Sequence, residues 1–208
     1  MASGGGTNLQ QLLDRFPNRD DSPAAARVVL VVSNRAGVGA LERAVRAEVP
    51  TEVIDPAAFE NPSAFGDCLI ELYRTNSIDL IVLAGYLKMI PSKLIAEYRN
   101  RMINIHPALL PGFGGKGMYG RRVHEAVLAD GAKISGCSVH FVDEKYDHGP
   151  IIAQRAVPVF HTDNPESLAA RVLVEEHKLL PEVVELIAAG KVKVIDGLAQ
   201  VISEDTGQ

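Results

Sequence analysis

Short apolar runs alternate with amphipathic, helix-like segments along the first half of the chain, and this alternation limits the fold more than any other feature. The apolar runs have the length of strands and cover residues 27–34, 51–54, 78–85 and 102–105. The segments with apolar residues at helical spacing are 7–16, 38–47, 62–76 and 91–99. This order predicts an α/β fold: one Rossmann-like, open, twisted and mostly parallel sheet with helices on both faces.

The second half of the chain continues with further helix-like segments, but its strand-like runs favour antiparallel pairing. A helix is expected at 121–129 and a long one at 165–189. The runs 135–143 and 149–160 alternate and are separated by a short loop, which predicts an antiparallel pair added to the sheet. The last run, 191–202, predicts a hairpin around Asp196-Gly197. With no repeat or linker, we expect residues 1–208 to form a single domain.

Composition narrows the classes of function. The net charge is −5, which disfavours a nucleic-acid binder that relies on a broad basic surface. No apolar run reaches the ~18 residues of a membrane span, and the first residues do not resemble a signal peptide. Cys68 and Cys137 are far apart and lack zinc-ligand spacing, so we expect no metal. A cytoplasmic protein with no membrane partner is predicted.

The glycines of "SGGGTNLQQLL" come directly before a predicted helix. Unpaired N–H groups at a helix start bind anions, and Gly6, Thr7 and Asn8 are the candidate ligands of a phosphate monoester. Leu9 stands where the dinucleotide fingerprint needs its third glycine, and the Gly-Lys-Ser/Thr of a nucleoside-triphosphate loop is absent. A glycine-rich start with no function is the alternative.

Such a loop normally follows a buried strand, yet only Met1, Ala2 and Ser3 precede it. A sheet without its central strand would leave backbone groups unpaired. We therefore expect that the first strand is truncated here and that the natural chain begins before Met1.

The stretch "NIHP" ends the run 102–105 with an amide and an imidazole two residues apart. Because side chains repeat every two residues along a strand, Asn104 and His106 lie on the same side. An amide can donate to an oxyanion and an imidazole can transfer a proton near neutral pH. Asp147, in a downstream loop, is expected to approach His106 and raise its pKa, although such pairs also occur as structural features.

The other histidines do not suggest chemistry. His140 lies within a predicted strand, His124 and His177 lie on predicted helices, and His161 lies in a loop. We expect each to be structural or on the surface. His148 adjoins Asp147, but no role follows from that position.

Several motifs together resemble the phosphoribosylglycinamide formyltransferases, a folate-dependent formyltransferase family. They extend from Ala2 to about Gly190 and include "SGGGTNLQ", "VVSNRAGVGALERA", "DLIVLAGYLKMI", "NIHPALLP", "GCSVHFVDEKYDHGPIIAQ" and "EEHKLLP". The resemblance implies transfer of the formyl group of 10-formyltetrahydrofolate to the amine of glycinamide ribonucleotide in purine synthesis. The reaction would proceed by direct attack through a tetrahedral intermediate.

The resemblance also implies the roles of individual residues. Asn104 would donate to the oxyanion, His106 would donate a proton, and Asp147 would support the histidine. The nucleotide phosphate would bind at Gly6, Thr7 and Asn8. The rest of the nucleotide would contact Leu173, Val174, Glu175 and Glu176. The folate would contact Leu87, Lys88, Met89, Ile90, Asn104, Asp143, Glu144, Lys145, Tyr146 and Asp147.

One departure and several alternatives accompany this reading. The loop "GFGGKGMYGRR" is rich in glycine, and we expect Leu110–Gly120 to form a mobile flap over the substrates. A formyltetrahydrofolate hydrolase, a formyltransferase with another acceptor, and a non-catalytic folate- or nucleotide-binding module are the competing functions. The sequence leaves open whether two copies form a homodimer.

Overall fold

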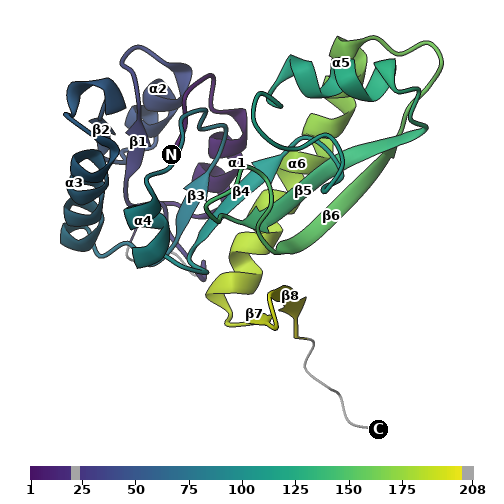
Figure 1. The fold of residues 1–208 in the computed structure, drawn as a ribbon. Coiled ribbons are helices and arrows are strands. Elements are labelled where there is room, and N and C mark those ends of the chain that lie inside the picture. Colours follow the sequence, from purple (N-terminus) through teal and green to yellow (C-terminus); the bar gives the residue numbers. More distant parts are fainter. Residues whose placement is uncertain (20–23, 203–208) are drawn as a thin grey trace, which may run out of the picture.

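The predicted helices and strands are present in the structure, a computed structural model that describes residues 1–19 and 24–202 (Figure 1). Residues 203–208 of the predicted domain lie outside this part. The elements of the first half are α1 (Thr7–Arg15), β1 (Val31–Ser33), α2 (Gly39–Arg46), β2 (Thr51–Val53), the 3-10 turn Pro56–Ala58, α3 (Pro62–Thr75), β3 (Ile81–Leu83), α4 (Ser92–Glu97) and β4 (Met102–His106). The second half contributes α5 (Arg121–Ala129), β5 (Ile134–Phe141), β6 (Ile151–Pro158), α6 (Pro165–Ala188), β7 (Val192–Ile195) and β8 (Leu198–Val201).

Two of the helices begin where the sequence supplies a cap. The side chain of Asn61 accepts a hydrogen bond from the N–H of Ala64 at the start of α3. At the start of α6, Asn164 and Ser167 form a reciprocal capping box. A proline follows each cap in the first helical position, where its missing N–H costs no hydrogen bond.

The strands form a mixed sheet, and the predicted α/β fold is confirmed. β3 pairs with β4 in parallel, while β4–β5 and β5–β6 are antiparallel. β1 pairs with β2 in parallel. The segment Met1–Ser3 lies between these two groups of strands: the N–H of Ala2 donates to Val32 O at 3.0 Å and the N–H of Ala84 donates to Met1 O at 2.9 Å. It therefore joins the strands into one layer (Figure 1).

β1, β3 and α4 are shorter than the sequence predicted. The apolar runs 27–34 and 78–85 become strands only at Val31–Ser33 and Ile81–Leu83, next to the short segment Met1–Ser3. Below this segment the two runs border a cavity of about 910 Å³ instead of a neighbouring strand. α4 covers Ser92–Glu97 rather than 91–99, and Asn100 follows with a φ of 57° that no right-handed helix contains.

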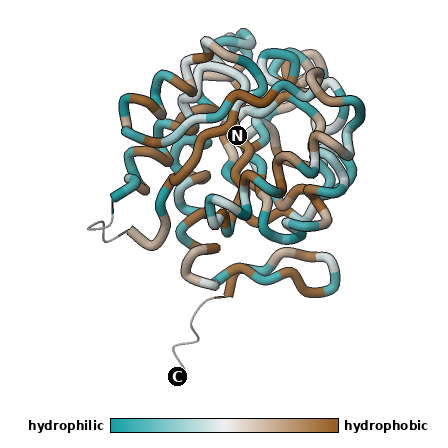
Figure 2. Tube along the Cα trace, turned by 90° about the vertical axis from the view of Figure 1, so that its left-hand side faces the viewer, coloured by the Kyte–Doolittle hydropathy of each residue, from teal (hydrophilic) through white to brown (hydrophobic). Residues whose placement is uncertain are grey.

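The sheet has a separate hydrophobic core on each face. On one face, Ile103 and Ile105 of β4 pack with residues of α1, α2 and α6. On the other face, Met102 packs with residues of α3 and α4. Hydrophobic segments consequently run through the middle of the body (Figure 2). Asn104 and His106 point to the same face as Met102, beyond the part that α3 and α4 cover.

The hairpin predicted at the end of the chain is confirmed. β7 and β8 pair in antiparallel fashion around Asp196 and Gly197, whose φ values of 51° and 78° suit a tight hairpin turn. The hairpin lies at one end of the molecule, beyond α6 (Figure 1). Within the described residues, none of the helices combines the length and the apolar character that crossing a bilayer requires.

Candidate active site

β4 presents Asn104 and His106 toward the same side, as the alternation of a strand requires. In the antiparallel pairing with β5, Asn104 lies opposite His140 and His106 lies opposite Ser138. His106 and His140 are both buried, with 3% and 2% of their surface exposed. A cluster of polar side chains therefore lies in the sheet itself, where pairing fixes their spacing.

Asp147 completes this cluster from the loop after β5. Its Oδ2 lies 3.6 Å from His106 Nδ1 and accepts a hydrogen bond from the N–H of Gly115 at 2.9 Å. Its Oδ1 lies 3.4 Å from Asn104 Nδ2. Asp147 has a φ of 54°, and strained backbone of this kind is found most often at functional sites. The structure thus brings together the three residues that the sequence singled out.

His140 also contacts this cluster, a position that the sequence did not predict. Its Nε2 lies 3.1 Å from Asn104 Nδ2 and 3.7 Å from Asp147 Oδ1. The contact arises because β4 and β5 pair and each carries a polar residue, Asn104 and His140, on the same face of the sheet. The register of that pairing cannot be read from the sequence, because shifting it by one residue moves every side chain to the other face.

The backbone decides which nitrogen of His140 carries the proton. His140 Nδ1 lies 2.7 Å from the carbonyl of Phe141 and must donate to it. In the neutral imidazole Nε2 then accepts a hydrogen bond from Asn104. One N–H of the Asn104 amide is therefore held by His140. The other makes only the long 3.4 Å contact with Asp147 and is the one that can turn to a ligand.

The glycine-rich loop closes over this cluster. His106 Nε2 donates to the carbonyl of Phe113 at 2.9 Å, and Gly115 donates to Asp147. Phe113 has a φ of 54°, and it is partly buried against the core that contains Ile103 and Ile105. The flap in this structure thus occupies one hydrogen-bonding position of His106, its Nε2, and one of Asp147, its Oδ2.

The pKa of His106 is shifted in the opposite direction to the one expected. Asp147 was expected to raise the pKa of His106, but the net effect is a lowered pKa because burial outweighs the nearby carboxylate. Burial alone would raise the pKa of Asp147, yet its contacts with His140, His106 and Gly115 prevail and lower it. Under the closed flap, His106 is a neutral imidazole beside a carboxylate.

Next to the cluster is a small cavity of about 90 Å³ that ends at Asn104, His140 and Asp147. Its other walls include Leu83, Ile95 and Val142. Nearly all of the predicted folate contacts line it: Lys88, Met89, Ile90, Asn104, Asp143, Glu144, Lys145, Tyr146 and Asp147.

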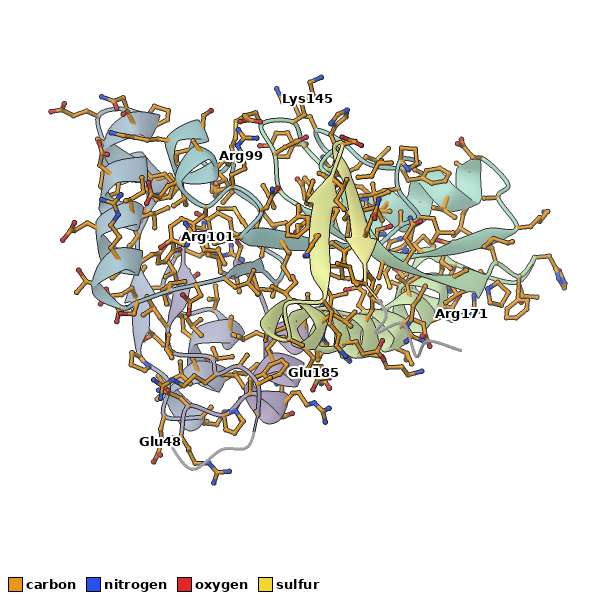
Figure 3. The ribbon with its side chains drawn as sticks, turned by 90° about the horizontal axis from the view of Figure 1, so that it is seen from below. Glu48, Arg99, Arg101, Lys145, Arg171 and Glu185 are labelled. Carbon is orange, nitrogen blue, oxygen red and sulfur yellow. The ribbon has the colours of Figure 1, made fainter. Side chains whose placement is uncertain are left out.

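Leu87 is the exception among the predicted folate contacts. It lies outside the lining of the cavity, and its N–H donates to Ser3 Oγ at 3.0 Å. Glu144 of the lining accepts a hydrogen bond from Arg99 at 3.0 Å, and Figure 3 labels Arg99 and Lys145 in the same part of the molecule.

A second polar site lies at the start of α1. Asn8 Nδ2 donates to Glu176 Oε2 of α6 at 2.6 Å, while Asn8 Oδ1 is buried without a hydrogen-bond donor. Burial raises the pKa of Glu176, although the bond from Asn8 opposes this effect. Gly6 has a φ of 73° and serves as the N-cap of α1. Thr7 follows as the first residue of the helix.

The other predicted nucleotide contacts on α6 are placed differently from Glu176. Glu175 accepts a bond from Lys178 at 2.8 Å, on the side of the helix that Arg155 also approaches. Val174 is 52% exposed. Among the described residues, the structure gives no polar contact between Asn8 and residues 173–175. In the described part of the chain no cluster of three or more His, Cys, Asp or Glu side chains could hold a metal ion.

Comparisons with known proteins agree with this arrangement. The family model described as formyl transferase matches residues 1–184. The chloroplastic phosphoribosylglycinamide formyltransferase of Arabidopsis thaliana is 45% identical over 93% of this chain and 65% of its own length. The trifunctional purine biosynthetic protein adenosine-3 of Bos taurus is 40% identical over 93% of this chain and 18% of its own length.

A solved structure is similar over nearly the whole chain. The crystal structure of glycinamide ribonucleotide transformylase 1 from Symbiobacterium toebii has a TM-score of 0.87 and 39% identity, over 97% of this chain and 92% of that chain. By contrast, the present chain spans less than two thirds of the length of the curated plant and bovine relatives.

Proposed function

This chain belongs to the formyl transferase family, and we propose that it transfers the formyl group of 10-formyltetrahydrofolate to the amine of glycinamide ribonucleotide, a step of purine synthesis. The observation that carries the proposal is the convergence of Asn104, His106 and Asp147, since Asn104 and Asp147 line a cavity and His106 contacts Asp147. The similarity to phosphoribosylglycinamide formyltransferases supports the choice of substrates.

Formyl transfer requires an amine to attack the formyl carbon, while the formyl oxygen gains negative charge and the amine loses a proton. Asn104 would stabilise the developing charge with the N–H that His140 does not hold. Donors fixed before the reaction stabilise such charge strongly because no reorganisation is needed. We infer that His140 positions this donor, since its own tautomer is set by the carbonyl of Phe141.

His106 and Asp147 would move the proton. With Nε2–H directed at Phe113, the unprotonated Nδ1 of neutral His106 faces the carboxylate at 3.6 Å. A proton taken up on Nδ1 would be stabilised by Asp147, so the pair can accept a proton from the amine and return it to the leaving group. Opening of the flap would reduce the burial that lowers the pKa of His106.

The folate supplies the formyl group when bound. The cavity has apolar walls for a flat ring, and residues 88–90 and 143–147 line it, in agreement with the predicted contacts other than Leu87. Gly6, Thr7 and Asn8 would hold the nucleotide phosphate, and Glu176 with Asn8 would bind its sugar hydroxyls. Lys88 is the candidate for the acidic folate tail. Cytoplasmic location, homodimer formation and a single domain over 1–208 stay predictions.

An activity measurement tests the proposal. Purified protein is mixed with 10-formyltetrahydrofolate, with and without glycinamide ribonucleotide, and loss of the formyl group is followed. We expect turnover only when the amine acceptor is present. Turnover without the acceptor would identify a hydrolase, and no turnover in either case would support a binding module.

Hydrogen exchange tests the flap. We expect amide exchange over residues 112–120 to slow when both substrates are bound, because the segment would then close on ligands instead of on His106 and Asp147. Leu110 was predicted to be the first residue of the flap, but its N–H donates to the buried Ser138 Oγ at 3.0 Å, so we expect it to be protected in both states and to serve as an internal control. Equal exchange over 112–120 in both states would contradict a mobile flap.

A further inference from the structure

The loop before α1 has a one-sided pattern of hydrogen bonds. The carbonyl of Gly4 accepts from the N–H of Ala40 at 3.0 Å, and the carbonyl of Gly6 accepts from the N–H of Gln10 at 2.9 Å. In the part of the chain that the structure describes, the N–H groups of residues 4–9 have no protein acceptor. The carbonyls of the loop are thus turned toward the protein, while its amides are available to an anion.

The two remaining carbonyls of the loop are held by arginine side chains. Arg35, which follows β1, donates from Nε to the carbonyl of Ser3 at 3.0 Å. Arg43, on α2, donates from Nε to the carbonyl of Gly5 at 2.8 Å and from Nη1 to Gln10 Oε1 at 2.9 Å. Each arginine therefore fixes the orientation of one peptide group and brings a positive charge to the loop.

The charge balance of the site requires such cations. A phosphate monoester carries a charge of about −1.5 to −2 near neutral pH, whereas a helix start supplies only about half a positive charge. Glu176 lies close by, since it accepts a hydrogen bond from Asn8. The charge of Arg43 reaches this region, because it adds to the burial that lowers the pKa of His177, the neighbour of Glu176.

We propose that Arg35 and Arg43 are positioning residues for the phosphate of the nucleotide: they hold the loop with its amides directed outward and they neutralise the dianion. This inference rests on the proposed function, because it concerns the same substrate. It predicts that the two arginines distinguish a phosphorylated acceptor from the same acceptor without phosphate. A residue that only stabilised the fold as a whole would affect both acceptors alike.

The test compares two acceptors in three variants. Arg43→Gln and Arg35→Gln each remove one cation. Arg46→Gln is the matched control, since Arg46 lies on α2 and its one hydrogen bond within the described residues goes to the carbonyl of Glu42 in its own helix. KM and kcat are measured with glycinamide ribonucleotide and with glycinamide ribonucleoside. We expect Arg43→Gln to raise the KM of the nucleotide by about 10- to 100-fold, with kcat and the KM of the nucleoside unchanged. Arg35→Gln should act in the same direction, and Arg46→Gln should have no effect.

Other outcomes have distinct meanings. An equal rise in KM for nucleotide and nucleoside would overturn the inference, because the arginine would then act on the site as a whole and not on the phosphate. Binding of inorganic phosphate, followed by calorimetry, separates this inference from the proposed function. Phosphate binding that is lost in Arg43→Gln supports the inference even if wild-type protein shows no formyl transfer, and phosphate binding that persists contradicts it. If Arg43→Gln does not fold, Arg35→Gln provides the same comparison.

Discussion

Replacing His106 by alanine, or Asp147 by asparagine, is expected to lower kcat by about two to four orders of magnitude while nucleotide affinity changes little. His106 Nδ1 lies 3.6 Å from Asp147, whereas both ring nitrogens of His140, the other imidazole beside Asp147, already bond to Phe141 and Asn104. Asp147→Asn keeps the size of the side chain, and asparagine tolerates the φ of 54° at this position. The loss would therefore report the missing charge and not a collapsed loop.

Steady-state kinetics and nucleotide binding by calorimetry check this expectation. Asp130→Asn, at the end of α5 and away from the cluster, is the control for a change of one charge. Similar losses in nucleotide affinity and in kcat would contradict the assignment, because both residues would then act on binding. An unchanged kcat in either variant would show that the proton follows another route.

The sequence predicted the parts of this site that depend on local rules. Asn104 and His106 lie on one side because strand side chains alternate, and α1 begins after Gly6 because glycine accepts the left-handed conformation there. The placement of Asp147 near them followed from a resemblance and from the meeting of loops at one edge of the sheet.

Features that depend on long-range geometry could not be predicted. His140 joins the cluster through a strand register that no local signal fixes. The direction of the His106 pKa depends on how deeply the flap buries the ring, a quantity that only the folded chain defines. The contacts of Arg35 and Arg43 with the loop likewise join segments that are far apart in the sequence, and no local pattern predicts that they meet. The residues at which β1 and β3 begin and end depend on the length of the segment that lies between them, Met1–Ser3.

Replacing Gly6 by valine is expected to weaken nucleotide binding by about 100-fold or more, with folate binding retained. A Cβ at this position would lie 2.7 Å from Ala40 Cα and 2.9 Å from Ala40 Cβ, both closer than real contacts allow. The φ of 73° adds strain of about 1–3 kcal/mol for a side chain branched at Cβ. Relief requires α1 or α2 to move, and either movement displaces the amides that face the phosphate.

The strain and the displacement can be separated with a second glycine. Gly131 has a similar φ of 66°, but a Cβ there would meet no atom within 4 Å. Gly131→Val therefore carries the same backbone strain without the contact, and it should lower thermal stability while nucleotide affinity stays within about twofold. If both variants lose nucleotide affinity equally, the effect comes from general destabilisation. A loss confined to Gly6→Val, measured as nucleotide and folate affinities by calorimetry, assigns the phosphate to the start of α1, because only there does the close approach of α2 fix the position of the binding amides.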